Sequence, residues 1–118
     1  MEGTVIVLER KLLGYSLRAE AKGLDEGMEV LLLGGCRTHI GAVSVGEPDG
    51  TVQTLEFPGH KDQLLSEPWA AALAKALGER TCVLCGIHYD EATKEQIAQI
   101  VETAGEMLLE LLERVTGR

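Results

Sequence analysis

Apolar and polar residues alternate with a period of two in much of the first half of the chain, which predicts β-strands. The segments Leu13–Ala21 and His39–Gly46 both follow this alternation. Three further apolar runs have the length of strands and lie at 4–8, 28–33 and 51–57. The intervening Glu47-Pro48-Asp49-Gly50 predicts a tight turn, because proline presets φ and glycine accepts a positive φ. We therefore expect the strands on either side of this turn to pair as an antiparallel hairpin.

After residue 60 the apolar positions recur at helical spacing. The first helical stripe consists of Leu65, Trp69, Ala72, Leu73, Ala76 and Leu77. Ser66-Glu67-Pro68 predicts the start of this helix, with an N-cap and an early proline, and Gly78 predicts its end. The segment Thr81–Tyr89 returns to the pattern of a strand.

A long amphipathic helix is predicted at the end of the sequence. Either Asp90 or Thr93 would cap it, and Thr93 and Gln96 have the spacing of a capping box. Its expected buried stripe is Ile97, Ile100, Val101, Ala104, Leu108, Leu111, Leu112 and Val115. Met107 and Leu109 fall outside this stripe and predict a wider apolar surface that could contact another subunit.

The predicted order of elements is βββββαβα, and no repeat or linker interrupts it. Strands followed by helices indicate an α+β fold, with an antiparallel or mixed sheet and two helices packed on it. The length of 118 residues suits a single domain spanning residues 1–118.

Composition narrows the classes of partner. The chain has 11 basic and 19 acidic residues, a formal net charge of −8, and only 3% aromatic residues. An acidic surface repels nucleic acids and anionic membranes, and base stacking needs aromatic side chains, so neither kind of partner is expected. Charges interrupt the first apolar run, which therefore does not resemble a signal peptide, and three cysteines do not suit a disulfide scaffold. We expect a cytoplasmic protein.

The cysteines do not predict a redox or zinc site on their own. Cys82 and Cys85 form a C-x-x-C motif, but they lie in a predicted strand, where residues three apart point to opposite faces. Cys36 follows Gly34-Gly35 at a strand end, and His39 is close enough in sequence to serve as a base. Since most lone cysteines are structural, a catalytic Cys36 is the less favoured interpretation.

The three histidines, His39, His60 and His88, each lie at a predicted boundary between a strand and a loop or helix. One interpretation treats them as unrelated; the other places them together in one site. Neutral imidazoles are common metal ligands and also suit phosphate or the edge of a flavin. Arg37 and Lys61 could neutralise a phosphate, whereas Asp90 fits a helix cap better than a ligand. No serine-hydrolase, dinucleotide-binding or P-loop motif is present.

Three short strings of residues resemble a known family. They are Gly34-Gly35-Cys36-Arg37-Thr38-His39-Ile40-Gly41-Ala42-Val43, Pro58-Gly59-His60-Lys61-Asp62 and Gly86-Ile87-His88-Tyr89-Asp90. Together they are similar to the LpdD-type prenylated-flavin chaperones that accompany UbiD-type decarboxylases. The resemblance runs from about Met28 to Thr93, and His-Ile-Gly-Ala and Pro-Gly-His-Lys are its most specific parts. Such proteins have often been labelled amino-acid decarboxylases, which does not suit so small a chain.

The resemblance implies a non-enzymatic homodimer that binds prenylated FMN, or FMN, and delivers it to the decarboxylase. It also implies a divalent metal that helps to hold the cofactor phosphate. Carried over by position, the cofactor site would have a polar core of three histidines, which would also be the metal ligands. Glycines would give room and basic residues would supply charge, so the expected site is Arg37, His39, Gly41, Gly59, His60, Lys61 and His88.

Two alternatives stay open. The order of strands and helices is also similar to small proteasome assembly chaperones, which would make the protein a binding factor for other proteins with Met107 and Leu109 in its working surface. The other alternative is a small metal-dependent enzyme that uses the same three histidines as metal ligands and keeps one coordination position open.

Overall fold

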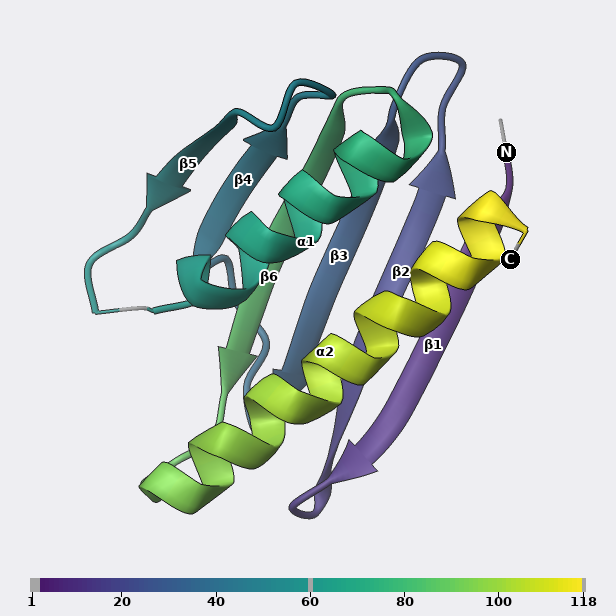
Figure 1. The fold of residues 1–118 in the computed structure, drawn as a ribbon. Helices are drawn as coiled ribbons and strands as arrows, with labels where there is room; N and C mark the ends of the chain where they lie inside the picture. Colours follow the sequence, from purple (N-terminus) through teal and green to yellow (C-terminus); the bar gives the residue numbers. More distant parts are fainter. Residues whose placement is uncertain (1–2, 60, 118) are drawn as a thin grey trace.

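The computed structural model describes residues 3–59 and 61–117, and confirms the α+β class and the predicted order of elements (Figure 1). The elements are β1 (Val5–Leu12), β2 (Tyr15–Gly23), β3 (Met28–Gly35), β4 (Ala42–Gly46), β5 (Val52–Glu56), α1 (Gln63–Leu77), β6 (Thr81–His88) and α2 (Lys94–Thr116). None of the helices in these ranges combines the length and the apolar character that crossing a membrane requires.

The six strands form one mixed sheet in the order β1-β2-β3-β6-β4-β5. β3 and β6 are parallel, and the other neighbours are antiparallel. The expected hairpin of β4 and β5 is confirmed, with Ser44 opposite Thr54. Because β3 and β6 are parallel neighbours, their carboxyl ends meet at one edge of the sheet, and the loops that follow them lie side by side.

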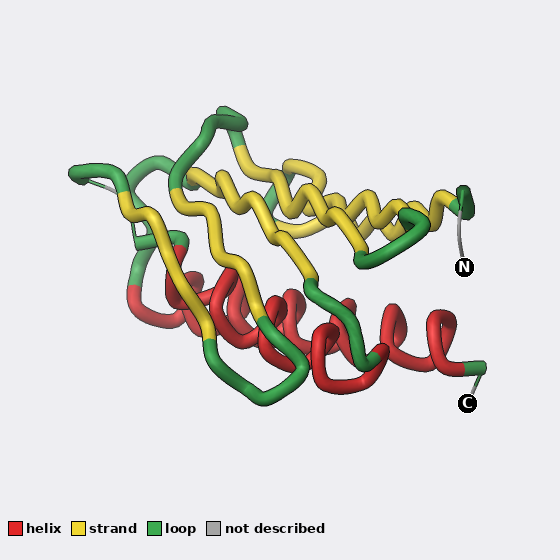
Figure 2. The backbone as a smooth tube through the Cα atoms, turned by 90° about the horizontal axis from the view of Figure 1, so that it is seen from above, coloured by secondary structure: helices red, strands yellow, loops and turns green. Residues whose placement is uncertain are grey.

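Both helices pack on the same face of the sheet, which makes a two-layer structure (Figure 2). The core between the layers is mainly aliphatic, and Trp69 is the only tryptophan in the chain and is 1% exposed. Gly46 allows close packing of α1 on β4, since a Cβ atom there would lie 2.4 Å from the carbonyl oxygen of Ala70. A buried hydroxyl pair also joins them, because Ser44 Oγ and Ser66 Oγ are 2.8 Å apart.

Several strand and helix boundaries differ from the prediction. The first strand, predicted at 4–8, extends to Leu12, and three other differences have local causes. Leu13 and Gly14 form the turn between β1 and β2, and their φ values of 54° and 84° are those of a type I′ hairpin turn, which needs positive φ at both positions. Residues 39–41 lie in a loop, and β4 begins only at Ala42. α1 begins at Gln63 with Asp62 at its N-cap position, so the predicted start at Ser66 was wrong and Pro68 lies inside the helix.

The surface of α2 also differs from the prediction. Met107, expected on the surface, is fully buried because it packs against the sheet, whereas Leu109 is 63% exposed. Ile97 and Val101, expected in the core, are 51% and 48% exposed. Thr93 caps the helix with Gln96 in a complete capping box, which leaves Asp90 for another role.

Candidate functional site

The ends of β3 and β6 are joined so tightly that only glycine fits at two positions. Gly35 is paired with His88 and has φ 84°, and a Cβ atom there would lie 1.9 Å from the His88 carbonyl oxygen. The next amide, that of Cys36, donates to the same oxygen at 2.8 Å. The loop then crosses β6 at Gly86, where a Cβ atom would be 1.5 Å from the His39 carbonyl oxygen. These contacts hold Cys36 and His39 beside the end of β6.

Asp62 connects this loop to the sheet and to α1. The carboxylate is 6% exposed, and its Oδ2 atom lies 3.1 Å from His39 Nε2. Its Oδ1 atom accepts the amide of Ile87 at 2.9 Å and lies 3.6 Å from the Cys85 thiol. Although Asp62 occupies the N-cap position of α1, its side chain makes no capping bond. An aspartate at the N-cap position usually accepts a hydrogen bond from an amide of its own helix. The Asp62 carboxylate instead binds the Ile87 amide and His39, so it holds the sheet and the loop together.

Gly41 provides the space for this carboxylate. A Cβ atom on Gly41 would lie 1.8 Å from Asp62 Oδ2 and 3.0 Å from His39 Nε2. The room expected at Gly41 for a ligand is therefore used by Asp62. The Cys85 thiol contacts the same carboxylate from within the core. Burial, together with the nearby Asp62 carboxylate, strongly raises the pKa of this thiol.

A second polar group lies at the end of β6. His88 Nε2 is 2.7 Å from Asp90 Oδ1, and the Cys36 thiol donates weakly to the His88 carbonyl oxygen at 3.4 Å. The hydrogen bond to His88, followed by one to Cys36, holds the pKa of Asp90 below its ordinary value. One potential ligand atom from each of Cys36, His88 and Asp90 lies within 4.8 Å of the others, so the three could hold a metal ion.

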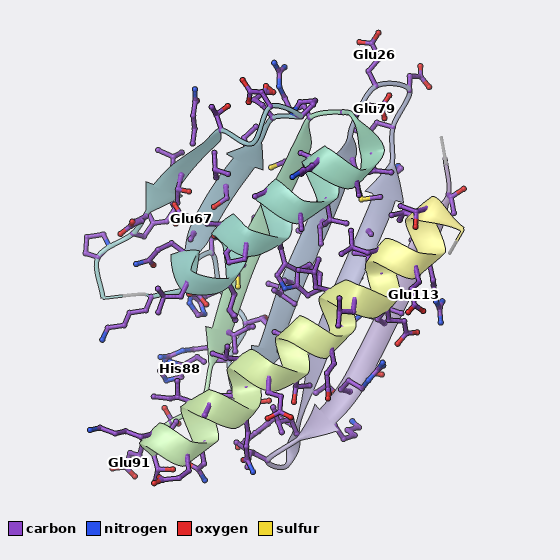
Figure 3. The ribbon with its side chains drawn as sticks, viewed as in Figure 1. Glu26, Glu67, Glu79, His88, Glu91 and Glu113 are labelled. Atoms are coloured by element: carbon purple, nitrogen blue, oxygen red, sulfur yellow. The ribbon has the colours of Figure 1, made fainter. Side chains whose placement is uncertain are left out.

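The two histidines of the described part are close together. The rings of His39 and His88 have centroids 6.4 Å apart and are nearly perpendicular. Figure 3 shows His88 at the end of β6, beside the first turns of α2. The structure thus gathers two imidazoles and two carboxylates, those of Asp62 and Asp90, at one edge of the sheet.

A groove of about 350 Å³ adjoins this edge, between the start of α1, the end of β6 and the first turns of α2. Its apolar side is formed by aliphatic side chains that are unusually exposed: Leu64 is 64%, Ile97 51% and Val101 48% exposed. Lys61 and His88 supply polar groups. Larger hollows lie elsewhere, including one of about 730 Å³ over the turn between β2 and β3, but that hollow contains no histidine.

Most of the predicted site residues lie at this edge, but they have different surroundings. His39 and His88 lie close together with their rings nearly perpendicular, and Gly59 and Lys61 line the groove. Arg37 is exposed in the loop after β3, near enough to contribute to the lowered pKa of Asp90. His60 lies outside the described residues, so its place in the cluster stays a prediction.

Several residues at this edge were not expected from the sequence to belong to a site. Asp62 was quoted within a family string without a role, and Asp90 was assigned to a helix cap. Ile97 and Val101 were assigned to the core. A signal was available only for Asp90, because Thr93 and Gln96 already satisfied the capping box and left Asp90 without that role.

Comparisons with known proteins show the family of the chain. Residues 11–116 match the model of the prenylated flavin chaperone LpdD-like domain. The chain belongs to this family. It is 30% identical to protein LpdD of Lactiplantibacillus plantarum over an alignment of 90 residues. The match covers 72% of this chain and 66% of that protein, just under two thirds of its length. The predicted family is thereby confirmed.

A solved structure shares the fold. The chain superposes with a TM-score of 0.51 on a structure described as a novel chaperone complex for yeast 20S proteasome assembly. The identity is 13%, and the match covers 92% of this chain and 98% of the other. At this identity the likeness concerns the arrangement of strands and helices alone.

Proposed function

We propose that the protein binds prenylated FMN in the groove beside His88 and delivers it to a UbiD-type decarboxylase. The observation that carries this proposal is the groove itself. Exposed aliphatic side chains of α1 and α2 line it together with Lys61 and His88. His39 lies outside the lining, with its ring centroid 6.4 Å from that of His88. Family membership supports a prenylated flavin as the ligand.

The groove suits a ligand with a flat apolar ring and a charged tail. Ligand pockets typically span about 300–1,000 Å³ and combine apolar walls with a few polar groups. Ile97 and Val101 lie on one face of α2 at i, i+4 spacing, so they offer a continuous aliphatic surface to a ring. Lys61 adds a cation at the groove, which offsets locally the overall charge of −8.

An exposed groove also suits a protein that must release its ligand. A ring lying against Ile97 and Val101 keeps its other face accessible, so a partner enzyme could take up the cofactor without unfolding this protein. This role requires no chemical step by the protein, in keeping with the non-enzymatic function that the family resemblance implies.

The first experiment is a titration of the protein with FMN and with prenylated FMN, with and without a divalent metal. Flavin absorbance and calorimetric heat would report binding. We expect saturable binding that weakens at least about 10-fold in Val101→Glu, because the variant loses apolar contact and places a carboxylate against the ring. Leu109→Glu is the matched control, since it changes another exposed aliphatic residue of the same helix that lies outside the groove.

Two variants separate the alternatives. The double variant His39→Ala with His88→Ala should lose flavin affinity while keeping its far-ultraviolet circular dichroism. Failure of the folded wild-type protein to bind either flavin would contradict the proposal and favour a factor that binds only proteins. Turnover of a substrate that a chelator abolishes would favour the metal-dependent enzyme.

We further propose a homodimer formed through the face of the sheet that no described helix covers. Leu31, Leu84, Val43 and Leu55 lie in register across four neighbouring strands on this face. Leu55 is 67% exposed, and the other three are half-buried. The two longest extents of the molecule, 39 and 27 Å, set an upper limit of roughly 1,000 Å² on the area of this face. A standard stable interface buries about 800 Å² on each partner, so the face is large enough for one.

Sedimentation velocity tests the dimer. Leu55→Glu should shift the protein towards the monomer, because it places two carboxylates in an apolar interface. Leu109→Glu tests the surface that the sequence predicted for a subunit contact, and we expect it to leave the dimer intact. Dissociation by Leu109→Glu alone would place the interface on α2 and refute this proposal.

A further inference from the structure

We infer that Cys36, His88 and Asp90 form a binding site for a divalent metal ion of borderline softness, for which Zn²⁺ is the matching probe. This set differs from the three histidines expected from the sequence. It does not depend on the flavin proposal, because it is argued from the donor atoms and their backbone support alone.

The backbone holds two of the three donors in place. Cys36 directly follows β3, and His88 is the last residue of β6, the strand paired with β3. The Cys36 amide donates to the His88 carbonyl oxygen at 2.8 Å. The close approach at Gly35 leaves little freedom between these positions. Asp90 lies two residues beyond His88, and its carboxylate already contacts the imidazole at 2.7 Å. The donors are therefore preorganised by strand pairing and by a direct hydrogen bond.

The distances suit one shared ion. One potential ligand atom of each residue lies within 4.8 Å of the other two. Ligand atoms around a tetrahedral Zn²⁺ with bonds of about 2.0–2.3 Å are roughly 3.3–3.6 Å apart. The donor atoms would have to move about 1 Å closer together than 4.8 Å to reach this spacing. Rotation of exposed side chains can supply this movement, since His88 is 33% and Asp90 76% exposed.

The donor types determine which metals would bind. A thiolate, an imidazole and a carboxylate together favour Zn²⁺ and related transition metals, while Mg²⁺ and Ca²⁺ prefer oxygen ligands. The two anionic donors neutralise the charge of the ion. Three protein ligands leave one coordination position for water or for an anionic group of another molecule. Because His88 also lines the groove, this position would be reachable from it.

The test is a calorimetric titration of metal-free protein with Zn²⁺ under a non-chelating reductant and without flavin. We expect one Zn²⁺ per chain. In Cys36→Ser the affinity for Zn²⁺ should fall by about 10–100-fold or more, because the loss of a residue that only supports a metal ligand already costs that much. Cys82→Ser is the matched control, because Cys82 is also half-buried but lies outside the cluster. His39→Ala should bind Zn²⁺ like the wild type.

Titration with Co²⁺ supplies a second, spectroscopic readout. Coordination by Cys36 would produce the intense near-ultraviolet absorption of a thiolate bound to cobalt, and this band should persist in Cys82→Ser. A Co²⁺ complex without this band would overturn the proposal. Unchanged Zn²⁺ affinity in Cys36→Ser, or an equal loss in His39→Ala, would also overturn it.

Discussion

The buried carboxylate of Asp62 provides the sharpest test of how the site is held together. In Asp62→Ala the Ile87 amide loses a charged acceptor at 2.9 Å, and His39 loses its contact at 3.1 Å. A hydrogen bond to a charged group is worth about 1.5–3 kcal/mol, and a partly exposed one contributes about 0.5–1 kcal/mol. The unfolding free energy should therefore decrease by about 2–4 kcal/mol. Asp62→Asn keeps an oxygen for the Ile87 amide, so it should cost about 1 kcal/mol.

Urea denaturation followed by circular dichroism measures this difference. With a slope of about 2 kcal/mol per molar urea, the midpoint should fall by about 1–2 M in Asp62→Ala and by about 0.5 M in Asp62→Asn. Asp25→Ala, which removes an exposed carboxylate from the turn between β2 and β3, is the control and should change the midpoint little. Equal midpoints for Asp62→Ala and the wild type, or equal losses for Asn and Ala, would refute this account of Asp62.

Three further results are expected. Gly86→Ala should destabilise the protein by about 3 kcal/mol or more in thermal melts, because its Cβ would overlap the His39 carbonyl; wild-type stability would contradict this packing. Arg10 holds the pKa of Glu110 below its ordinary 4.5, so this pair stabilises the fold above pH 4.5 and the contribution is lost as the pH falls through the lowered value. In urea melts, Glu110→Gln should be less stable than the wild type at neutral pH and should approach it in acid; an equal deficit at every pH would count against the ion pair. Cys85, whose thiol pKa is raised by burial and by the nearby carboxylate, should resist alkylation until the protein unfolds, as mass spectrometry of partly labelled protein would show.

The arrangement of elements follows from local patterns in the sequence. Alternation identified the strands, and the spacing of Trp69 and Leu73 identified the first helix, because one face of each element packs in the core. The opposite orientations of Cys82 and Cys85 were also predicted correctly: Cys85 is buried in the core, and Cys82 lies half-buried on the other face. These features depend only on the geometry of a single element.

The errors occur where a contact between distant segments overrides a local preference. His39 continues an alternating pattern, yet it leaves the sheet because its loop crosses Gly86. Asp62 has the place of a helix cap, but its carboxylate binds the Ile87 amide 25 residues away. Ile97 and Val101 continue the apolar stripe of α2, but this part of the helix extends past the core and lines the groove. Helical spacing alone cannot distinguish a core residue from a binding-surface residue.

Binding of the flavin in the groove beside His88 can be followed by amide chemical shifts of isotope-labelled protein during titration with prenylated FMN. We expect the largest changes at Gly59, His88 and Val101, with little change at Gln53, which lies on the far face of the sheet. Saturable changes confined to that far face, or no changes at ligand concentrations that saturate a UbiD-type enzyme, would contradict it.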